Sequence, residues 1–166
     1  MEIESLFIES QRFKQPWLWA ILLGADVLVL YTVLTKVWSG RSRGLILAAF
    51  VPLIILILVN VLFAMLRLET VIKQDGIAVR FYPFHLKYKH YPWSKIAQVY
   101  VREYDPIGEY GGWGIRLGLF GRGRAFNVSG DKGIQLVFTD GSRLLIGTNK
   151  PEEADAALQK TVHLTV

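Results

Sequence analysis

The sequence predicts a membrane protein in which an α-helical hairpin precedes a mainly-β domain. Two apolar blocks, residues 17–38 and 45–66, are each long enough to span a bilayer as a helix. From residue 67 onward, short runs of alternating apolar and polar residues are separated by Gly and Pro turns, which is the pattern of antiparallel strands. The chain is 52% hydrophobic, more than the roughly 45–50% of soluble domains, and the excess lies in the two blocks.

Residues 1–15 are predicted to form a short amphipathic or irregular lead-in, because apolar and charged residues mix there without a clear period. Pro16 then opens the transmembrane hairpin of residues 16–66, at a position where its missing N–H costs little. Each block has 22 residues and would extend about 33 Å as a helix, which matches a hydrocarbon core about 30 Å thick. No small-residue cleavage site follows the first block, so we expect a retained anchor rather than a signal peptide.

The turn at residues 39–44 is too short for anything but a tight connection between antiparallel helices, so both termini are expected on one side of the membrane. Basic residues near the spans favour the cytoplasm for the termini, although the turn has the denser charge. Those on the turn side are Lys36, Arg41 and Arg43, and those on the terminal side are Arg12, Lys14, Arg67, Lys73 and Arg80. We therefore expect a multi-pass protein of the cell (inner or plasma) membrane with cytoplasmic N- and C-termini.

Each apolar block has a strongly polar residue in its interior, Asp26 in the first and Asn60 in the second. Asp26 lies nine residues from Trp17, and Asn60 lies six residues from Leu66, both counted from the same membrane face. Their depths differ by roughly one helical turn, so an interhelical hydrogen bond between them is expected. In one interpretation, Asp26 holds the hairpin or a homo-oligomer together. In the other, it belongs to a proton or ion pathway, since acids within a membrane are costly and often functional.

Residues 67–166 are predicted to form one domain of about seven short antiparallel strands, arranged as a sandwich or barrel. Asp-Gly turns are expected at residues 75–76 and 140–141, and prolines end several of the other runs. The strand runs lie at residues 68–73, 77–82, 86–91, 96–104, 115–120, 125–128, 134–138 and 144–147.

The last predicted element is a helix that begins near Pro151. Thr148 or Asn149 can cap it, and Glu152 and Glu153 are favourable in its first turn. A small barrel with one open end, plugged by this C-terminal helix, would account for the order of the elements.

Several segments resemble small bacterial two-helix membrane proteins that carry a C-terminal PH-like (pleckstrin-homology-like) domain, a family of uncharacterised function. The similar segments are residues 77–85, 91–96, 109–116, 125–130 and 145–148 together with 151–153. The likeness covers nearly all of residues 67–158, and the preceding hairpin agrees with it. The resemblance implies a PH-like barrel of about seven antiparallel strands with a C-terminal helix. It brings no catalytic residues with it, and the PH-like fold serves many kinds of partner.

The most distinctive stretch of the chain is the glycine-rich segment of residues 104–116, which is followed by a second glycine turn. Aromatic and arginine side chains in such a setting are typical of a protein or ligand contact. We expect the partner-binding residues to be Tyr110, Trp113, Arg116, Arg122 and Arg124. A purely structural alternative stays open, in which Trp113 covers the core and the glycines only form turns.

Composition excludes several classes of function. The chain has no cysteine, and its three histidines lack metal-site spacing, so neither thiol chemistry nor a metal site is expected. The glycines match no nucleotide motif, and no cofactor is expected. The net charge of +5 is too diffuse for nucleic acid and suits anionic lipid. No enzyme is expected. A hydrolase that uses Asp105 and Glu109 is the least favoured hypothesis.

These observations favour a membrane-anchored PH-like module for binding or regulation. It would recruit another membrane or cytoplasmic protein, or contact lipid head groups, at the cytoplasmic face, and homo-oligomers remain open. The alternative is an oligomeric pore or proton-linked transport component centred on Asp26. Conductance or pH-driven flux in proteoliposomes, abolished by Asp26→Asn, would distinguish that alternative from a binding module.

Overall fold

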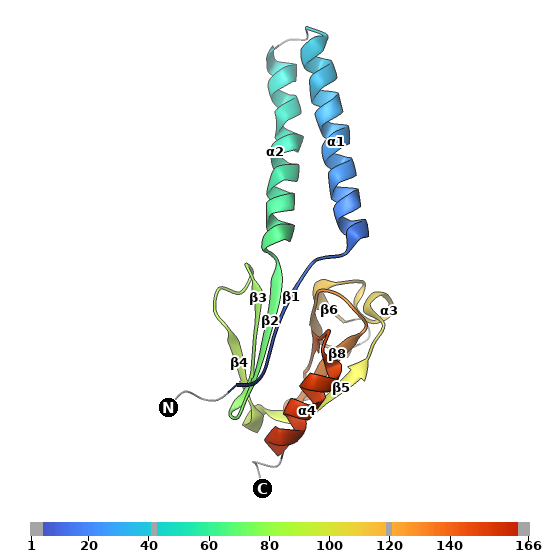
Figure 1. The fold of residues 1–166 in the computed structure, drawn as a ribbon. Coiled ribbons are helices and arrows are strands. Elements are labelled where there is room, and N and C mark those ends of the chain that lie inside the picture. The colour runs from blue at the N-terminus through green and yellow to red at the C-terminus, as the bar shows by residue number, and fades with distance from the viewer. Residues whose placement is uncertain (1–4, 41–42, 119–120, 163–166) are drawn as a thin grey trace. The chain divides into compact units, whose positions relative to one another are not determined.

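The computed structural model describes residues 5–40, 43–118 and 121–162. The chain divides into two compact units, which are described separately. A helical unit comprises Phe13–Met65, and a β unit combines the N-terminal segment up to Arg12 with the chain from Leu66 onward (Figure 1). The two apolar blocks are therefore inserted in the chain between the two segments that form the β unit.

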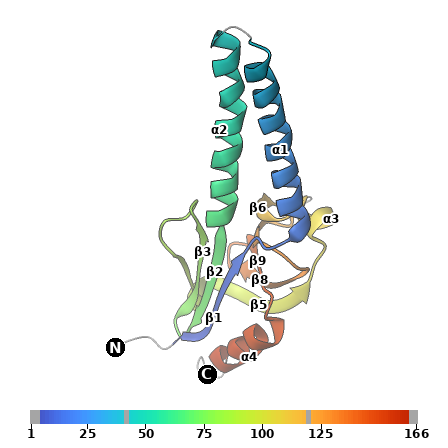
Figure 2. The same cartoon turned by 45° about the horizontal axis from the view of Figure 1, so that its top comes forward.

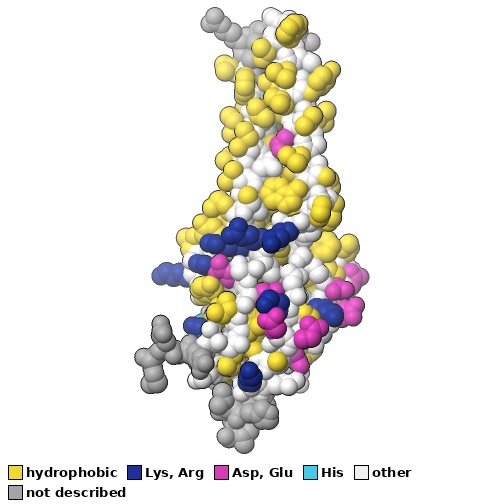
Figure 3. All heavy atoms as spheres, viewed as in Figure 1, with side chains coloured by type: hydrophobic (Ala, Val, Ile, Leu, Met, Phe, Trp, Pro, Cys, Tyr) yellow, Lys and Arg dark blue, Asp and Glu magenta, His cyan; other side chains and the backbone are white. Residues whose placement is uncertain are grey.

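The helical unit consists of α1 (Pro16–Trp38) and α2 (Arg43–Met65). Within the described residues, α1 is long and apolar enough to cross a membrane, by length and composition. Hydrophobic side chains predominate on the visible face of the helical unit, with one acidic side chain among them (Figure 3). The pair is tied at one end by Phe13, whose ring meets Phe63 edge-on at 5.6 Å and whose carbonyl oxygen accepts a hydrogen bond from the Trp19 indole.

The first sheet of the β unit has the strand order β1-β2-β3-β4, and all of its pairs are antiparallel. Its strands are β1 (Ser5–Arg12), β2 (Arg67–Lys73), β3 (Gly76–Tyr82) and β4 (Lys89–Pro92). Arg12 pairs with Arg67, and Arg67 pairs with Tyr82. The chain therefore leaves this sheet for α1, and returns to it from α2, at the same end of two neighbouring strands.

The second sheet has the order β5-β8-β9-β7-β6. Its strands are β5 (Ile96–Glu103), β6 (Gly114–Leu117), β7 (Arg124–Asn127), β8 (Lys132–Phe138) and β9 (Arg143–Gly147). A 3-10 turn, η1 (Trp93–Lys95), precedes β5, and α3 (Pro106–Tyr110) links β5 to β6. The C-terminal helix α4 (Pro151–Val162) follows β9. Figure 2 shows the two sheets from a second direction.

The core of the β unit lies between the inward faces of the two sheets. Alternate residues of β2 and β3 point into it, and so do Ile134, Leu136 and Ile146 of the second sheet. One face of α4 is buried through Ala154, Ala157 and Leu158, and the helix contacts β1 and β2 as well as β5 and β8. The C-terminal helix itself was predicted, and it packs against strands of both sheets.

The strands differ from the predicted barrel in two respects. Those of the described residues form two sheets rather than a closed barrel, and β7 and β9 are parallel. In this sheet β8 lies between β5 and β9. One edge of β9 is therefore occupied by β8, and β7 pairs with the other edge. Parts of two predicted segments, residues 41–42 of the turn and 119–120 of a strand run, lie outside the described residues.

The N-terminal segment differs from the expected irregular or amphipathic lead-in, because residues 5–12 form β1 on the edge of the first sheet. Its inward positions include two polar residues, Glu9 and Gln11, which hide the alternation of a strand. Both find distant partners. The Glu9 carboxylate accepts hydrogen bonds from the Thr148 hydroxyl at 2.6 Å and the Asn149 N–H at 2.9 Å, and the Gln11 amide donates to the Gly147 carbonyl at 2.7 Å.

We call the hydrogen bonds of Glu9 and Gln11 to residues 147–149 the latch between β1 and the end of β9, and they lead to a first prediction. Thr148→Val removes the hydroxyl that donates to Glu9 and that accepts the Lys150 N–H at 3.1 Å. Because hydrogen bonds to buried charged groups are strong, we expect the free energy of unfolding to fall by about 1.5–3 kcal/mol. Urea denaturation of the detergent-solubilised full chain, followed by tryptophan fluorescence, measures it. The exposed variant Thr139→Val is the control, and an equal effect of both would contradict the latch.

Candidate functional site: an arginine groove beside α3

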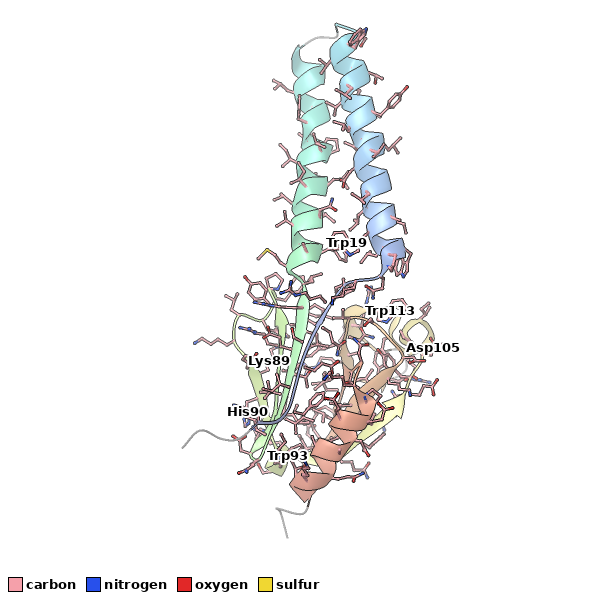
Figure 4. The ribbon with its side chains drawn as sticks, in the orientation of Figure 1. Trp19, Lys89, His90, Trp93, Asp105 and Trp113 are labelled. Atoms are coloured by element: carbon pink, nitrogen blue, oxygen red, sulfur yellow. The ribbon has the colours of Figure 1, made fainter. Side chains whose placement is uncertain are left out.

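The glycine-rich segment contains a short helix, α3, whose two ends are capped. The Asp105 side chain accepts a hydrogen bond from the Ile107 N–H at 3.0 Å, and Pro106 occupies the first helical position. At the other end, Gly111 has φ of 69° and donates its N–H to the Ile107 carbonyl, so that the chain turns away. Figure 4 shows the labelled side chains of Asp105 and Trp113 close to this helix.

A small second core lies between α3 and the outward face of the second sheet. Tyr104, Tyr110, Ala125 and Leu145 form it, and the two tyrosine rings meet edge-on at 5.9 Å. The Tyr104 hydroxyl accepts a hydrogen bond from the Asn127 amide at 3.0 Å. Burial raises the pKa of Tyr104 to about 12, so this phenol stays neutral. The second core fixes α3 on the sheet.

Beside α3, the same face of the sheet is hollowed into an open groove of about 510 Å³. We call it the arginine groove. Its walls come from β5, α3, the turn before β7, β8 and β9, and its lining residues are Tyr100, Arg102, Glu109, Arg122, Gln135 and Arg143. The groove therefore depends on segments that are brought together only by the fold of the second sheet.

Glu109 organises this groove. Its carboxylate binds the Arg102 guanidinium through two contacts, at 3.1 and 2.7 Å, and pairs with Arg122 at 2.7 Å. It also accepts the Asp105 N–H at 3.1 Å. The hydrogen bond from Arg102 is the largest cause that lowers the pKa of Glu109, to about 2. Glu109 is thus ionised at all physiological pH values, and it fixes two guanidinium groups at the groove wall.

The groove keeps an excess of positive charge. Three arginines face one carboxylate, and the exposed Arg143 side chain makes no hydrogen bond or ion pair with the described residues. Arg102 is further oriented by the Gln135 side-chain oxygen at 3.0 Å. Guanidinium groups held in fixed positions suit the planar, bidentate recognition of carboxylates or phosphates. The arrangement can therefore bind an anionic group.

The five predicted partner-binding residues do not form one surface. Arg122 lies in the arginine groove, whereas Tyr110 is only 2% exposed and supports the groove from beneath. Trp113 and Arg116 form a separate pair: the Arg116 Nε donates to the Trp113 carbonyl at 3.0 Å, and the Trp113 indole donates to the Gly130 carbonyl at 3.1 Å. Arg124 lines another depression, with His90, Tyr91, Lys95, Phe138, Thr139, Asp140 and Ser142.

Sequence reasoning missed most of the groove. Arg102 of β5 lies more than thirty residues before Gln135 of β8 and Arg143 of β9, and no local motif links the three. Alternation along β5 offered a partial signal for the groove. Tyr100 and Arg102 are two residues apart, so they lie on the same face of the strand, and both carry polar groups. The two carboxylates of the hydrolase alternative have different contacts: Asp105 caps α3, and Glu109 pairs with Arg102 and Arg122.

The two polar residues of the helical unit are joined as expected. The Asn60 side-chain amide donates to both carboxylate oxygens of Asp26, at 3.1 and 3.0 Å, and also donates to the Leu56 carbonyl at 2.9 Å. The predicted interhelical hydrogen bond is confirmed. A bond of this kind contributes about 0.6–2 kcal/mol to helix association in a membrane.

No family model, curated protein or solved structure matches this chain. Among the residues that the structure describes, no three His, Asp or Glu side chains gather in a way that could hold a metal ion. The chemistry of the arginine groove is therefore the main guide to function.

Proposed function

We propose that this chain is a membrane-anchored binding module whose arginine groove holds acidic side chains of a protein partner. One observation carries the proposal: Glu109 fixes Arg102 and Arg122 at the groove wall, while Arg143 keeps its guanidinium available. An acidic peptide segment supplies several carboxylates, and each can engage one planar guanidinium. The groove offers no nucleophile paired with a base, so binding fits it better than catalysis.

In this proposal both helices of the helical unit cross the membrane. The support is topological: β1 pairs with β2 in one sheet, so residues 5–12 and 67–73 lie on the same side of any membrane. If α1 crosses, the chain has to cross again before β2, and α2, with 23 residues and an apolar sequence, is the segment available for this. The hydrogen bond between Asp26 and Asn60 would then hold the two spans together.

We further propose that the β unit is a PH-like domain at the cytoplasmic face. The PH-like assignment is supported by two packed sheets followed by a C-terminal helix that contacts both. The β unit departs from the predicted plan of about seven strands in two ways: its described residues form nine strands, β1 among them, and its chain is interrupted by the helical unit. The balance of basic residues flanking the spans supports the cytoplasmic side.

The test is crosslinking and co-purification of the tagged full-length protein from its native membranes. We expect Arg143→Glu to reduce the recovered partner at least about tenfold, because it replaces a guanidinium by a like charge facing the partner's carboxylates. Arg143 makes no side-chain bond with the described residues, so the variant should insert and fold normally. Membrane yield and thermal unfolding check this.

The matched control is the double variant Trp113→Ala plus Arg116→Ala, which alters the separate surface pair. Loss of the partner in this control, with normal capture by Arg143→Glu, would overturn the groove and return the contact to the glycine-rich segment. If neither variant changes protein capture, but Arg143→Glu abolishes binding to anionic liposomes, the groove's ligand would be lipid and the protein-partner proposal would be wrong.

A further inference from the structure

The loop between β3 and β4, residues 83–88, displays large apolar side chains in the open. Phe84 is 59% exposed and Leu86 is 74% exposed, and the next residue, Lys87, is exposed as well. Two large apolar side chains exposed so close together are unfavourable in water and are typical of a contact surface. We call this segment the β3–β4 loop.

The loop is not a loose excursion of the chain, because both of its ends are fixed. The His85 N–H donates to the Phe81 carbonyl at 2.8 Å, and the His85 Nδ1 accepts the Phe81 N–H at 3.3 Å. The His85 ring also packs edge-on against Phe126, at 5.2 Å between ring centres. At the far end, the Tyr88 hydroxyl donates to Glu69 at 2.7 Å. Phe84 and Leu86 are thus held out from a fixed frame.

The surroundings of the loop are cationic. Residues 76–90 contain no Asp or Glu and carry three basic residues, Arg80, Lys87 and Lys89. Glu69, which lies at the foot of the loop, is paired with Arg80 at 2.8 Å, and Arg80 lies over the Tyr88 ring at 4.6 Å. Apolar and aromatic side chains next to Lys and Arg match the interface of an anionic bilayer, where tails and head-group phosphates lie side by side.

Chain continuity limits how far this loop can lie from the end of α2. The loop follows Tyr82, which pairs with Arg67, and Arg67 comes two residues after Met65, the last residue of α2. Two residues of chain span at most about 7 Å, and neighbouring strands lie about 5 Å apart. A bilayer that contains α2 is therefore within reach of the β3–β4 loop.

We propose that the β3–β4 loop is a second membrane contact, in which Phe84 and Leu86 enter the bilayer interface and Lys87 binds anionic head groups. The inference rests on the proposed membrane anchor, but it is independent of the arginine groove. The loop would fix the β unit against the membrane, which two helix connections alone do not do.

The test uses the absence of cysteine from the chain, which allows single labelling sites. Leu86→Cys carries an environment-sensitive fluorophore in the full-length protein, reconstituted in phosphatidylcholine nanodiscs with or without about one third phosphatidylglycerol. Lipids that carry a quencher at head-group depth report contact. The control site is Gln74→Cys, an exposed position in the turn at the opposite end of β2 and β3, about 20 Å away along the strands.

We expect the label at residue 86 to be quenched strongly and the label at residue 74 weakly. In the Leu86→Cys background, Phe84→Ser should lower the ratio of bound to free loop about tenfold through lost apolar burial. Lys87→Ala should lower it about fivefold in anionic nanodiscs and leave it nearly unchanged in neutral ones.

Two results would count against the inference, and they are distinguishable. Equal quenching at residues 86 and 74, in a chain that resists alkaline extraction from membranes, would overturn the loop contact and leave the anchor intact. Release of the chain by alkaline extraction would overturn the anchor and the loop contact with it. Partner capture through Arg143 is measured separately, so its failure leaves this inference standing.

Discussion

Replacing Glu109 by Gln lowers the free energy of unfolding by about 2 kcal/mol at neutral pH, between the values for buried and exposed ion pairs. The variant leaves the guanidinium groups of Arg102 and Arg122 next to a neutral amide, in place of the carboxylate that now pairs with both. The side chain of Glu109 is 12% exposed and that of Arg102 is 25% exposed, so water replaces these contacts incompletely. Urea denaturation of the full chain measures the loss.

Acid provides an independent check on this variant. The folded pKa of Glu109, about 2, lies below its ordinary value of 4.5. Its contribution to stability is therefore complete above about pH 4.5 and is lost as the pH falls towards 2. The wild-type and Glu109→Gln stabilities should converge over this interval. Glu69 and Asp140 also have lowered pKa values, so both proteins retain some acid sensitivity.

Glu103→Gln is the matched control, because Glu103 is an exposed glutamate near α3 whose side chain pairs with none of the described residues. Its effect on stability should stay within about 0.5 kcal/mol. A Glu109→Gln protein as stable as this control at neutral pH would show that Glu109 does not organise the groove.

Gly123→Ala lowers the free energy of unfolding by about 3 kcal/mol, from a steric clash combined with an unfavourable backbone angle. Gly123 has φ of 85°, and a Cβ at this position would lie 2.7 Å from the Cβ of Arg143 and against its carbonyl oxygen. The residue sits directly before β7, where the chain begins its parallel pairing with β9. Alanine therefore forces β7 and β9 apart and displaces Arg143 from the arginine groove.

Gly141→Ala separates the two causes. Gly141 has φ of 80°, close to that of Gly123, but a Cβ there meets no atom within 4 Å. This control should lose only about 1 kcal/mol, from the backbone angle alone. Thermal unfolding of both variants, together with partner capture, gives the comparison. Equal losses would contradict the close approach of Gly123 to β9.

The elements that could be predicted from the sequence are those with local signals. Asp75-Gly76 and the alternation around it located β2 and β3, and the capping residues before Pro151 located α4. β1 was missed because its inward Glu9 and Gln11 depend on partners more than a hundred residues away. Strand prediction from alternation assumes that the inward-facing residues are apolar. In β1 a buried carboxylate takes an inward position instead, because its oxygens are hydrogen-bonded.

The candidate site was predictable only in part, for a related reason. The glycines of residues 104–116 indicate turns, but Asp105 and Gly111 also cap a short helix that begins at Pro106. Signals for a turn and for so short a helix are the same residue types. Tyr110 was expected on the surface, and the helix turns it into the second core instead. The arginines of the groove come from β5, from the turn before β7 and from β9, and they converge because of the strand order, which the sequence does not encode locally.

The pairing of β1 with β2 also bears on how the protein is made. β1 leaves the ribosome first, but its neighbour β2 is synthesised only after both helices, and the donors to Glu9 lie 139 and 140 residues downstream. In the proposed membrane arrangement, β1 has to wait on the side where the β unit later emerges. A chain whose first helix inserts without the return of the second would separate β1 from β2 and could not complete the sheet. In that arrangement, the complete β unit can form only in a chain whose two helices have both inserted.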